Sequence, residues 1–250
     1  MMRSHGASSP QESQAITCFE MFEDHMYAAL DRFVLSVGRS VECARDEIIF
    51  HEGDLCSRFY RVVEGTVRMC RFRHDGSRQI EAFYLPGDYF GFDIGREARF
   101  TAEATTNTAL LAVDATSPRD YGDRSRIVNS AIWKLALDEL HRSQNHALVL
   151  GYRHAHDRVL AFLEEITARL HRVSSIDLPM SRQDIADYLG LTIETVSRSF
   201  TDLSREGVIG MPRPRTVILK KAMRAQVAGS SCGNSMVVRS SDKFSSIPAN

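Results

Sequence analysis

The sequence SRQDIADYLGLTIETVSR at residues 181–198 decides the fold prediction. It predicts two short helices joined by a tight turn. Ser181 is a helix-capping residue type, and Asp184 three positions later completes an acidic variant of the capping box. Gly190 can adopt the left-handed conformation that ends a helix, and Thr192 can cap the next helix. The spacing therefore predicts a helix-turn-helix.

The second predicted helix has one apolar face and one polar face. Ile193, Val196 and Phe200 form its expected inner stripe. The residues expected on the opposite face are Glu194, Ser197, Arg198 and Thr201. A helix-turn-helix places its second helix in the DNA major groove, with base contacts near the N-terminus of that helix. An ordinary helical hairpin with a solvated polar face is the alternative. The residues that mark the predicted motif are Ser181, Gly190, Ile193 and Phe200.

The segment after this helix predicts the wing of a winged helix. Gly207 is expected to end the helix, and residues 213–221 alternate strand-forming residues with basic ends, which indicates a small β-hairpin. Cations in this region can contact phosphates, which position a protein on DNA without specifying its sequence. A solubilising surface is the alternative role for each cation. The candidates for DNA-backbone contacts are Ser181, Arg182, Thr192, Thr195, Arg205, Arg213 and Arg215, with Lys220 and Lys221 as further cations.

Charge is distributed unevenly along the chain. The 250 residues carry a formal net charge of −1, whereas residues 192–221 hold six Lys and Arg against three Asp and Glu. A local basic excess on a neutral body fits one DNA-facing module. No apolar run approaches the roughly 18–20 residues that span a bilayer, and residues 1–12 lack the apolar core of a signal peptide. We therefore expect a cytoplasmic protein without a membrane partner, whose five cysteines stay reduced.

Residues 41–113 alternate short β-rich runs with turn signals, which is typical of an antiparallel β-roll or barrel. Gly65 and Gly76 are expected at hairpin turns for reasons of backbone conformation. The predicted strands lie at residues 47–50, 58–63, 66–72 and 79–85.

A helical stretch is expected from residue 127 to residue 170, with a break at residues 151–153. A long helix that follows a barrel can pair with its copy across a two-fold axis. Its loosely spaced apolar residues are Ile127, Ala131, Leu135, Leu140 and Leu148. The predicted fold class is α+β. Its parts are a disordered N-terminus at 1–20, a β-roll at 21–125, a dimerisation helix at 126–152, a winged helix-turn-helix at 153–222 and a disordered tail at 223–250.

Three runs of the predicted roll carry a family resemblance. They are DEIIFHEGD at residues 46–54, FYRVVEGTVR at 59–68 and LPGDYFG at 85–91. They resemble a cyclic-nucleotide-binding-type domain, and together with the helix-turn-helix they resemble the Crp–Fnr superfamily of bacterial transcription regulators. Residues 78–92 and 184–198 are similar to FixK-type activators, which belong to nitrogen-fixation and low-oxygen respiratory regulation. The resemblance implies a homodimer that binds a palindromic operator on double-stranded DNA and contacts RNA polymerase.

The resemblance also implies which residues contact bases. In that superfamily a Glu, a residue three positions later and an Arg directly after it face the bases; here these are Glu194, Ser197 and Arg198. Arg198 can pair bidentately with guanine O6 and N7, and Glu194 can accept from an exocyclic amine. Ile193 stands where cyclic-AMP-type members have an Arg. The pattern implies an Fnr-like palindrome near TTGAT-N4-ATCAA.

The family's known effectors can be tested against the residues. Members that bind cyclic AMP hold the phosphodiester with a Gly-Glu and an Arg followed by a small hydroxyl residue. Here Gly87 precedes Asp88, and Arg99 precedes the bulky Phe100, so we expect Asp88 to be a turn residue and Arg99 a surface or salt-bridge residue. Cys18 is the only cysteine before residue 40, so a four-cysteine iron–sulfur site of the family's type is not expected.

Haem or metal ligation and catalysis are not expected either. The histidines near the predicted dimer and hinge helices are expected to be solvated or hinge residues; they are His141, His146, His154 and His156. No nucleophile–base motif, zinc-hydrolase spacing or P-loop is present in the sequence. The sequence therefore predicts a regulator without a cofactor or a metal, not an enzyme. The alternative is a small-molecule sensor in which a cyclic nucleotide or haem in the roll gates DNA binding.

Overall fold

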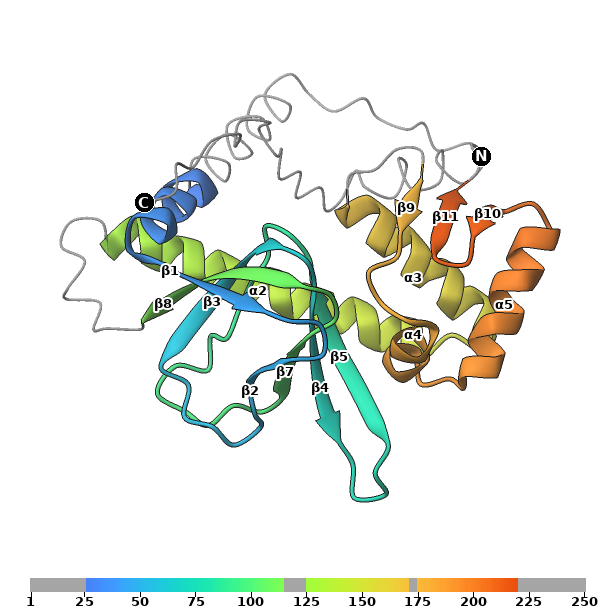
Figure 1. The fold of residues 1–250 in the computed structure, drawn as a ribbon, viewed down its shortest axis with the longest axis horizontal. Coiled ribbons are helices and arrows are strands. Elements are labelled where there is room, and N and C mark those ends of the chain that lie inside the picture. The colour runs from blue at the N-terminus through green and yellow to red at the C-terminus, as the bar shows by residue number, and fades with distance from the viewer. Residues whose placement is uncertain (1–25, 115–124, 171–174, 220–250) are drawn as a thin grey trace, which may run out of the picture.

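The computed structural model describes residues 26–114, 125–170 and 175–219 (Figure 1). It has the predicted α+β architecture, in which an N-terminal β-roll is followed by a long helix and a C-terminal winged helix-turn-helix. Both segments predicted to be disordered, residues 1–20 and 223–250, lie outside the described residues.

The roll consists of two four-stranded antiparallel sheets, with strand orders β1-β8-β3-β6 and β2-β7-β4-β5. The predicted strands are present as β2, β3, β4 and β5, with ends within one residue of the prediction. The pattern does not predict β7, because its buried residues are two alanines alternating with Thr101 and Glu103, which form no apolar run. The strands are β1 (Arg39–Cys43), β2 (Ile48–Phe50), β3 (Arg58–Glu64), β4 (Val67–Phe72), β5 (Arg78–Tyr84), β6 (Tyr89–Phe90), β7 (Thr101–Ala104) and β8 (Thr108–Asp114).

The two turn glycines have the predicted backbone conformation. Gly65 has φ 83° and Gly76 has φ 80°, values that favour glycine. At Gly65 space is limiting as well, since an added Cβ would lie 2.4 Å from the backbone oxygen of Asn107. Turn chemistry therefore accounts for both glycines.

Aromatic rings fill the interior of the roll. Tyr60 and Phe90 stack with ring centroids 5.1 Å apart, and Tyr84 lies 5.2 Å from Phe90. Phe50 extends the cluster, with its centroid 5.9 Å from that of Tyr60. Phe90 is 1% exposed, so the space between the two sheets is occupied by side chains.

The predicted break between two helices is confirmed, because α2 ends at Leu150 and α3 begins at Ala155. The sequence pattern does not predict the helix at residues 26–37. Its Leu30 and Val34 are fully buried in a cluster with Ala131 of α2 and with residues of the roll. The other helices are α2 (Ser125–Leu150), α3 (Ala155–Arg169), α4 (Arg182–Leu189) and α5 (Ile193–Arg205).

The loosely spaced apolar residues of the long helix do not share one environment. Ala131 and Leu135 are buried against the roll, whereas Leu140 is 51% and Leu148 is 67% exposed. The spacing drifts around the helix, so the first pair faces the core and the second pair does not. α2 therefore has an exposed apolar face distinct from its core face.

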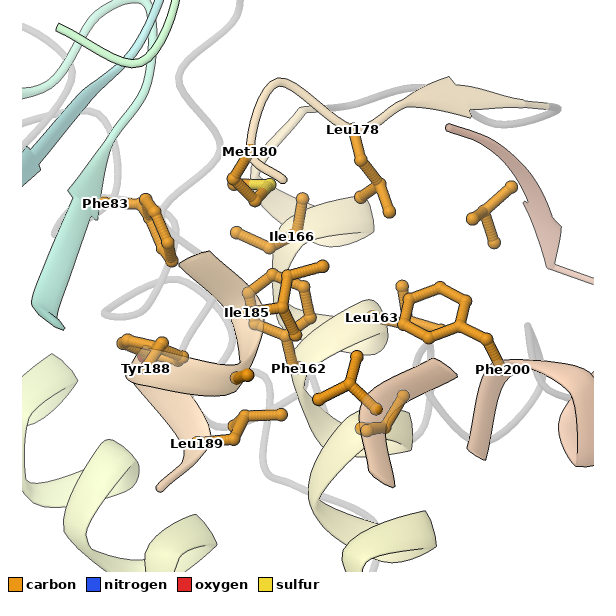
Figure 2. Close-up of a cluster of buried hydrophobic side chains, with 14 of the residues drawn as sticks. Phe83, Phe162, Leu163, Ile166, Leu178, Met180, Ile185, Tyr188, Leu189 and Phe200 are labelled. Atoms are coloured by element: carbon orange, nitrogen blue, oxygen red, sulfur yellow. The ribbon is translucent and has the colours of Figure 1, made fainter. Parts of the chain in front are cut away.

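A third apolar cluster forms the core of the C-terminal module and continues into the roll (Figure 2). Phe162 and Ile166 of α3 pack with Ile185 of α4. Phe83, on β5 of the roll, faces Tyr188 of α4, with ring centroids 5.3 Å apart. The two parts of the chain are thus joined by shared packing. Among the described residues no helix is long and apolar enough to cross a membrane.

Candidate nucleic-acid interface

The turn between α4 and α5 has the predicted capping geometry. The Ser181 hydroxyl accepts from the Asp184 amide at 3.1 Å, and the Asp184 carboxylate accepts from the Ser181 amide at 2.9 Å, which completes the capping box. Gly190 ends α4 with φ 62°, and the Thr192 hydroxyl accepts from the amide of Thr195 at 3.3 Å. These local bonds set where each helix begins and ends.

The inner stripe of α5 differs from the prediction at its first member. The buried residues of α5 are Val196, Ser199, Phe200 and Leu203. Ile193 is 37% exposed, so its placement in the inner stripe is wrong. It is the first residue of α5, and the apolar core does not extend as far as that first turn.

The outer face of α5 presents the three predicted base-contacting residues. Glu194, Ser197 and Arg198 are all exposed, and so is Thr201. The pKa of Glu194 is lowered by its backbone hydrogen bond, by the Thr192 hydroxyl and by the charge of Arg198. Glu194 is therefore an anionic acceptor at neutral pH, one helical turn from a guanidinium donor. An acceptor and a bidentate donor on one exposed helix face can match base edges in a major groove.

The wing is a hairpin, but it begins earlier than predicted. β10 (Ile209–Arg213) pairs with β11 (Thr216–Leu219), and β11 also pairs with the short β9 (Ile176–Asp177). The prediction started the hairpin at Arg213, which instead ends its first strand. Pro212 breaks the apolar pattern of that strand, and the register shifts between Gly210 and Arg213.

The exposed candidates for DNA-backbone contacts lie on α5 and the wing. Arg205, Arg213 and Arg215 are exposed, as is Thr192, whereas Thr195 is half-buried. The Arg205 guanidinium lies 3.1 Å from Asp202, and Arg215 donates to the backbone oxygen of Leu178 at 3.2 Å. Lys220 and Lys221 lie outside the described residues.

Arg182 is more enclosed than the other candidates. Its guanidinium carbon lies 3.1 Å from the centre of the Phe200 ring, and Nη2 donates to the backbone oxygen of Pro214 at 3.0 Å. Burial lowers the pKa of Arg182 to about 10, with a smaller effect from the charge of Arg215. Arg182 thus joins α4 to α5 and the wing.

The effector candidates in the roll have other partners. Asp88 accepts from the Leu85 amide, as a turn residue does, and also from Arg169 of α3 at 2.6 Å and Arg142 of α2 at 3.4 Å. The prediction of a turn residue is therefore right but incomplete. Arg99 is exposed and lies 3.5 Å from Asp93, as expected of a surface residue.

The hinge histidines divide into two kinds. His141 and His154 are exposed, and His156 lies 3.2 Å from Glu206. His146 is buried, stacks on Tyr188 with centroids 3.8 Å apart and bonds to the backbone oxygen of Tyr188 at 2.8 Å. Within the described parts of the chain, no cluster of three His, Cys, Asp or Glu side chains has metal-site geometry. Cys43, Cys56 and Cys70 are free thiols.

Two family models match the chain. The model described as "Bacterial regulatory proteins, crp family" matches residues 178–209, which include the helix-turn-helix. The cyclic nucleotide-binding domain matches residues 40–123, which include the roll. The matches coincide with the two parts of the fold.

Several similar proteins are nitrogen-fixation regulators. The nitrogen fixation regulation protein FixK of Azorhizobium caulinodans is 42% identical over 192 residues, which cover 75% of this chain and 77% of the relative. The FixK protein of Rhizobium meliloti is 43% identical over 173 residues, covering 69% and 79%. The solved structure of FixK2 from Bradyrhizobium japonicum matches with a TM-score of 0.71 and 38% identity over 76% of this chain and 96% of that one. The chain therefore belongs to the Crp family of bacterial regulatory proteins, where it resembles FixK-type transcriptional regulators and not enzymes.

Proposed function

We propose that this FixK-like regulator is a homodimeric activator that binds an inverted repeat near TTGAT-N4-ATCAA and contacts RNA polymerase at promoters for nitrogen fixation and low-oxygen respiration. The observation that carries the proposal is the outer face of α5. There Glu194, Ser197 and Arg198 are exposed together, while the opposite face is anchored in the core by Val196 and Phe200. Such a protein works in the cytoplasm, where its operator lies.

The chemistry of the three side chains supports specific recognition. Arg198 donates bidentately to guanine O6 and N7, and Glu194 accepts from the exocyclic amine of a neighbouring base. Ser197 adds a hydroxyl or methylene contact. The exposed cations Arg205, Arg213 and Arg215 hold phosphates and fix the register on the duplex.

The exposed face of α2 supports the dimer. Trp133 is 70%, Leu137 is 37% and Leu140 is 51% exposed. Their spacing of four and three residues continues through the exposed Gln144 and Ala147, which is the repeat of a two-helix seam. A second copy of α2 would cover this apolar face and set two α5 helices about one DNA turn apart.

We also propose that the roll binds no cyclic nucleotide, although it matches the family model of that name. A bound phosphodiester needs an inward-facing cation. Arg99 is exposed and paired with Asp93, Asp88 is bonded to two arginines, and aromatic rings occupy the interior. The residues present do not fit the ligand. A calorimetric titration with cyclic nucleotides and an absorption spectrum of the purified protein test this part, and binding of a nucleotide or a haem band would support the sensor alternative.

DNA binding is tested by fluorescence anisotropy. The purified dimer is titrated into a labelled TTGAT-N4-ATCAA duplex and into a scrambled duplex at moderate salt. We expect tighter binding to the inverted repeat by about 10³-fold or more. Equal affinity for both duplexes, with the dimer verified by sedimentation, would overturn the proposal.

A further inference from the structure

Two arginines of the roll reach across to the helix-turn-helix. Arg68 on β4 donates from Nη1 to Asp184 Oδ1 at 3.2 Å. Arg78 on β5 donates from Nη2 to the same oxygen at 2.6 Å and from Nε to Asp187 Oδ2 at 2.8 Å. Both acceptors lie on α4, more than 100 residues later in the sequence. The sheet thus holds the first helix of the DNA-binding motif.

The charges of this cluster are largely removed from water. The side chain of Asp184 is 5% exposed, that of Arg68 is 10% and that of Arg78 is 18%. Arg68 also pairs with Glu103 of β7, whose Oε2 lies 2.7 Å from Arg68 Nε, and with the exposed Asp46 at 3.2 Å. Buried ion pairs of this kind are costly to break, because the remaining partner is left unpaired.

Asp184 uses its two oxygens for two tasks. Oδ2 accepts from the amide and hydroxyl of Ser181 at 2.9 and 2.7 Å and so caps α4. Oδ1 accepts from Arg68 and Arg78. The N-terminus of α4 is therefore fixed to the sheet through the same group that starts the helix.

A second contact holds the other end of α4. Tyr188 stacks on His146 of α2, and the Tyr188 backbone oxygen bonds to its ring. Two attachment points fix the direction of a helix axis, whereas one point allows the helix to pivot. α4 and α5 pack closely and are joined only by Gly190, Leu191 and Thr192, so the direction of α4 also sets the direction of α5.

We infer that Arg68 and Arg78 are positioning residues for DNA binding, which hold the base-contacting face of α5 at a fixed distance from the dimer axis. The inference rests on the proposed function. In a dimer joined through α2, the distance between the two α5 helices depends on how each module is seated on its roll. The roll arginines thereby set which half-site spacing the dimer accepts.

The test uses the full-length dimer and a set of duplexes. The two half-sites are separated by three, four, five or six base pairs, and one further duplex carries a single half-site. The variants are Arg68→Gln, Arg78→Gln and Arg78→Lys. The matched control is Arg73→Gln. Arg73 is an exposed residue in the turn between β4 and β5, and its side chain donates to Gln79 at 3.2 Å without reaching α4 in the described structure.

We expect Arg78→Gln to raise the Kd for the four-base-pair spacing about tenfold, as typical couplings within buried networks do. The Kd for the single half-site stays near the wild-type value, so the preference among spacings flattens. Lys cannot bond both carboxylates as the planar guanidinium does, so Arg78→Lys recovers only part of the preference. Arg73→Gln keeps the wild-type profile.

A wild-type spacing profile in Arg68→Gln and Arg78→Gln would overturn the inference. Equal weakening of binding to every duplex would also overturn it, because a merely structural role of the arginines predicts equal weakening. A wild-type protein without preference for the inverted repeat would instead refute the proposed function. If circular dichroism shows that the arginine variants do not fold, Asp187→Asn removes one bond at the edge of the cluster, and its spacing profile decides in the same way.

Discussion

Replacing Asp184 with Ala should destabilise the folded chain by about 4 kcal/mol. Loss of a helix cap costs about 1 kcal/mol. Removal of one partner from a buried ion pair costs about 3–5 kcal/mol. The lower end applies here, because Arg68 keeps Glu103 and Arg78 keeps Asp187 as remaining partners. A loss of this size is a large part of the roughly 5–15 kcal/mol that stabilises a typical protein.

Urea unfolding followed by far-ultraviolet circular dichroism measures this cost, with Ser181→Ala as the matched variant. Ser181→Ala removes the capping hydroxyl but leaves the arginine contacts of Asp184, so it should cost only about 1 kcal/mol. The gap of about 3 kcal/mol between the two variants is the contribution of the contact with the roll. If Asp184→Ala and Ser181→Ala lie within 1 kcal/mol of each other, the buried cluster does not stabilise the fold and the reasoning fails.

The same carboxylate predicts a dependence on pH. Burial opposes its ionisation, but the hydrogen bonds from Ser181 and the charges of Arg68 and Arg78 outweigh burial and hold the pKa of Asp184 below its usual value of 3.8. A lowered folded-state pKa means that the stabilisation is present above about pH 4 and is lost as the pH falls through the folded-state value. The stability difference between wild type and Asp184→Asn should therefore be constant near neutral pH and shrink below pH 4. A difference that stays unchanged at pH 3 would contradict this assignment.

Three further outcomes are expected. In anisotropy titrations, Arg198→Ala should lose about 1–3 kcal/mol of binding free energy per half-site and relax the guanine preference, whereas Arg205→Ala should weaken binding to all sequences alike. Equal effects of Arg198→Ala on operator and random duplexes would exclude base contact. Leu140→Glu on the exposed face of α2 should shift sedimentation toward the monomer and red-shift the emission of Trp133, the chain's one tryptophan. An unchanged sedimentation coefficient would count against α2 as the dimer seam. Burial raises the pKa of Cys70 to about 12, so iodoacetamide should label Cys70 much more slowly than the half-buried Cys56. Mass spectrometry of the peptides measures both labelling rates, and equal rates would contradict the burial of Cys70.

The start and end of each short helix in the DNA-binding motif could be predicted from the sequence. The capping box of Ser181 and Asp184, the left-handed Gly190 and the cap at Thr192 involve residues at most three positions apart or a single backbone conformation. Such signals are local, so the sequence contains them completely. The same holds for Gly65, whose turn requires a positive φ.

The burial of individual apolar residues was less predictable, because it depends on how far the core extends. Ile193 fits the apolar spacing of α5, yet it is exposed because the core ends before the first turn of that helix. Leu135 and Leu140 have the same chemistry in α2, but the first faces the roll and the second does not. A periodic pattern gives the faces of a helix without saying which neighbour covers each face.

The sequence by itself determined the helix-turn-helix, its caps, the outward face of Glu194, Ser197 and Arg198 on α5 and the family, because these depend on residue type at short spacing. Only the tertiary structure decided that Arg68 and Arg78 meet Asp184, and that Asp88 binds arginines of both α2 and α3. These pairs are separated by 54 to 116 residues. Nothing in the spacing of charges selects one partner over another at such separation. The packing of β5 against α4 brings Asp184 to the two arginines, and the contacts of the roll with α2 and α3 bring Arg142 and Arg169 to Asp88.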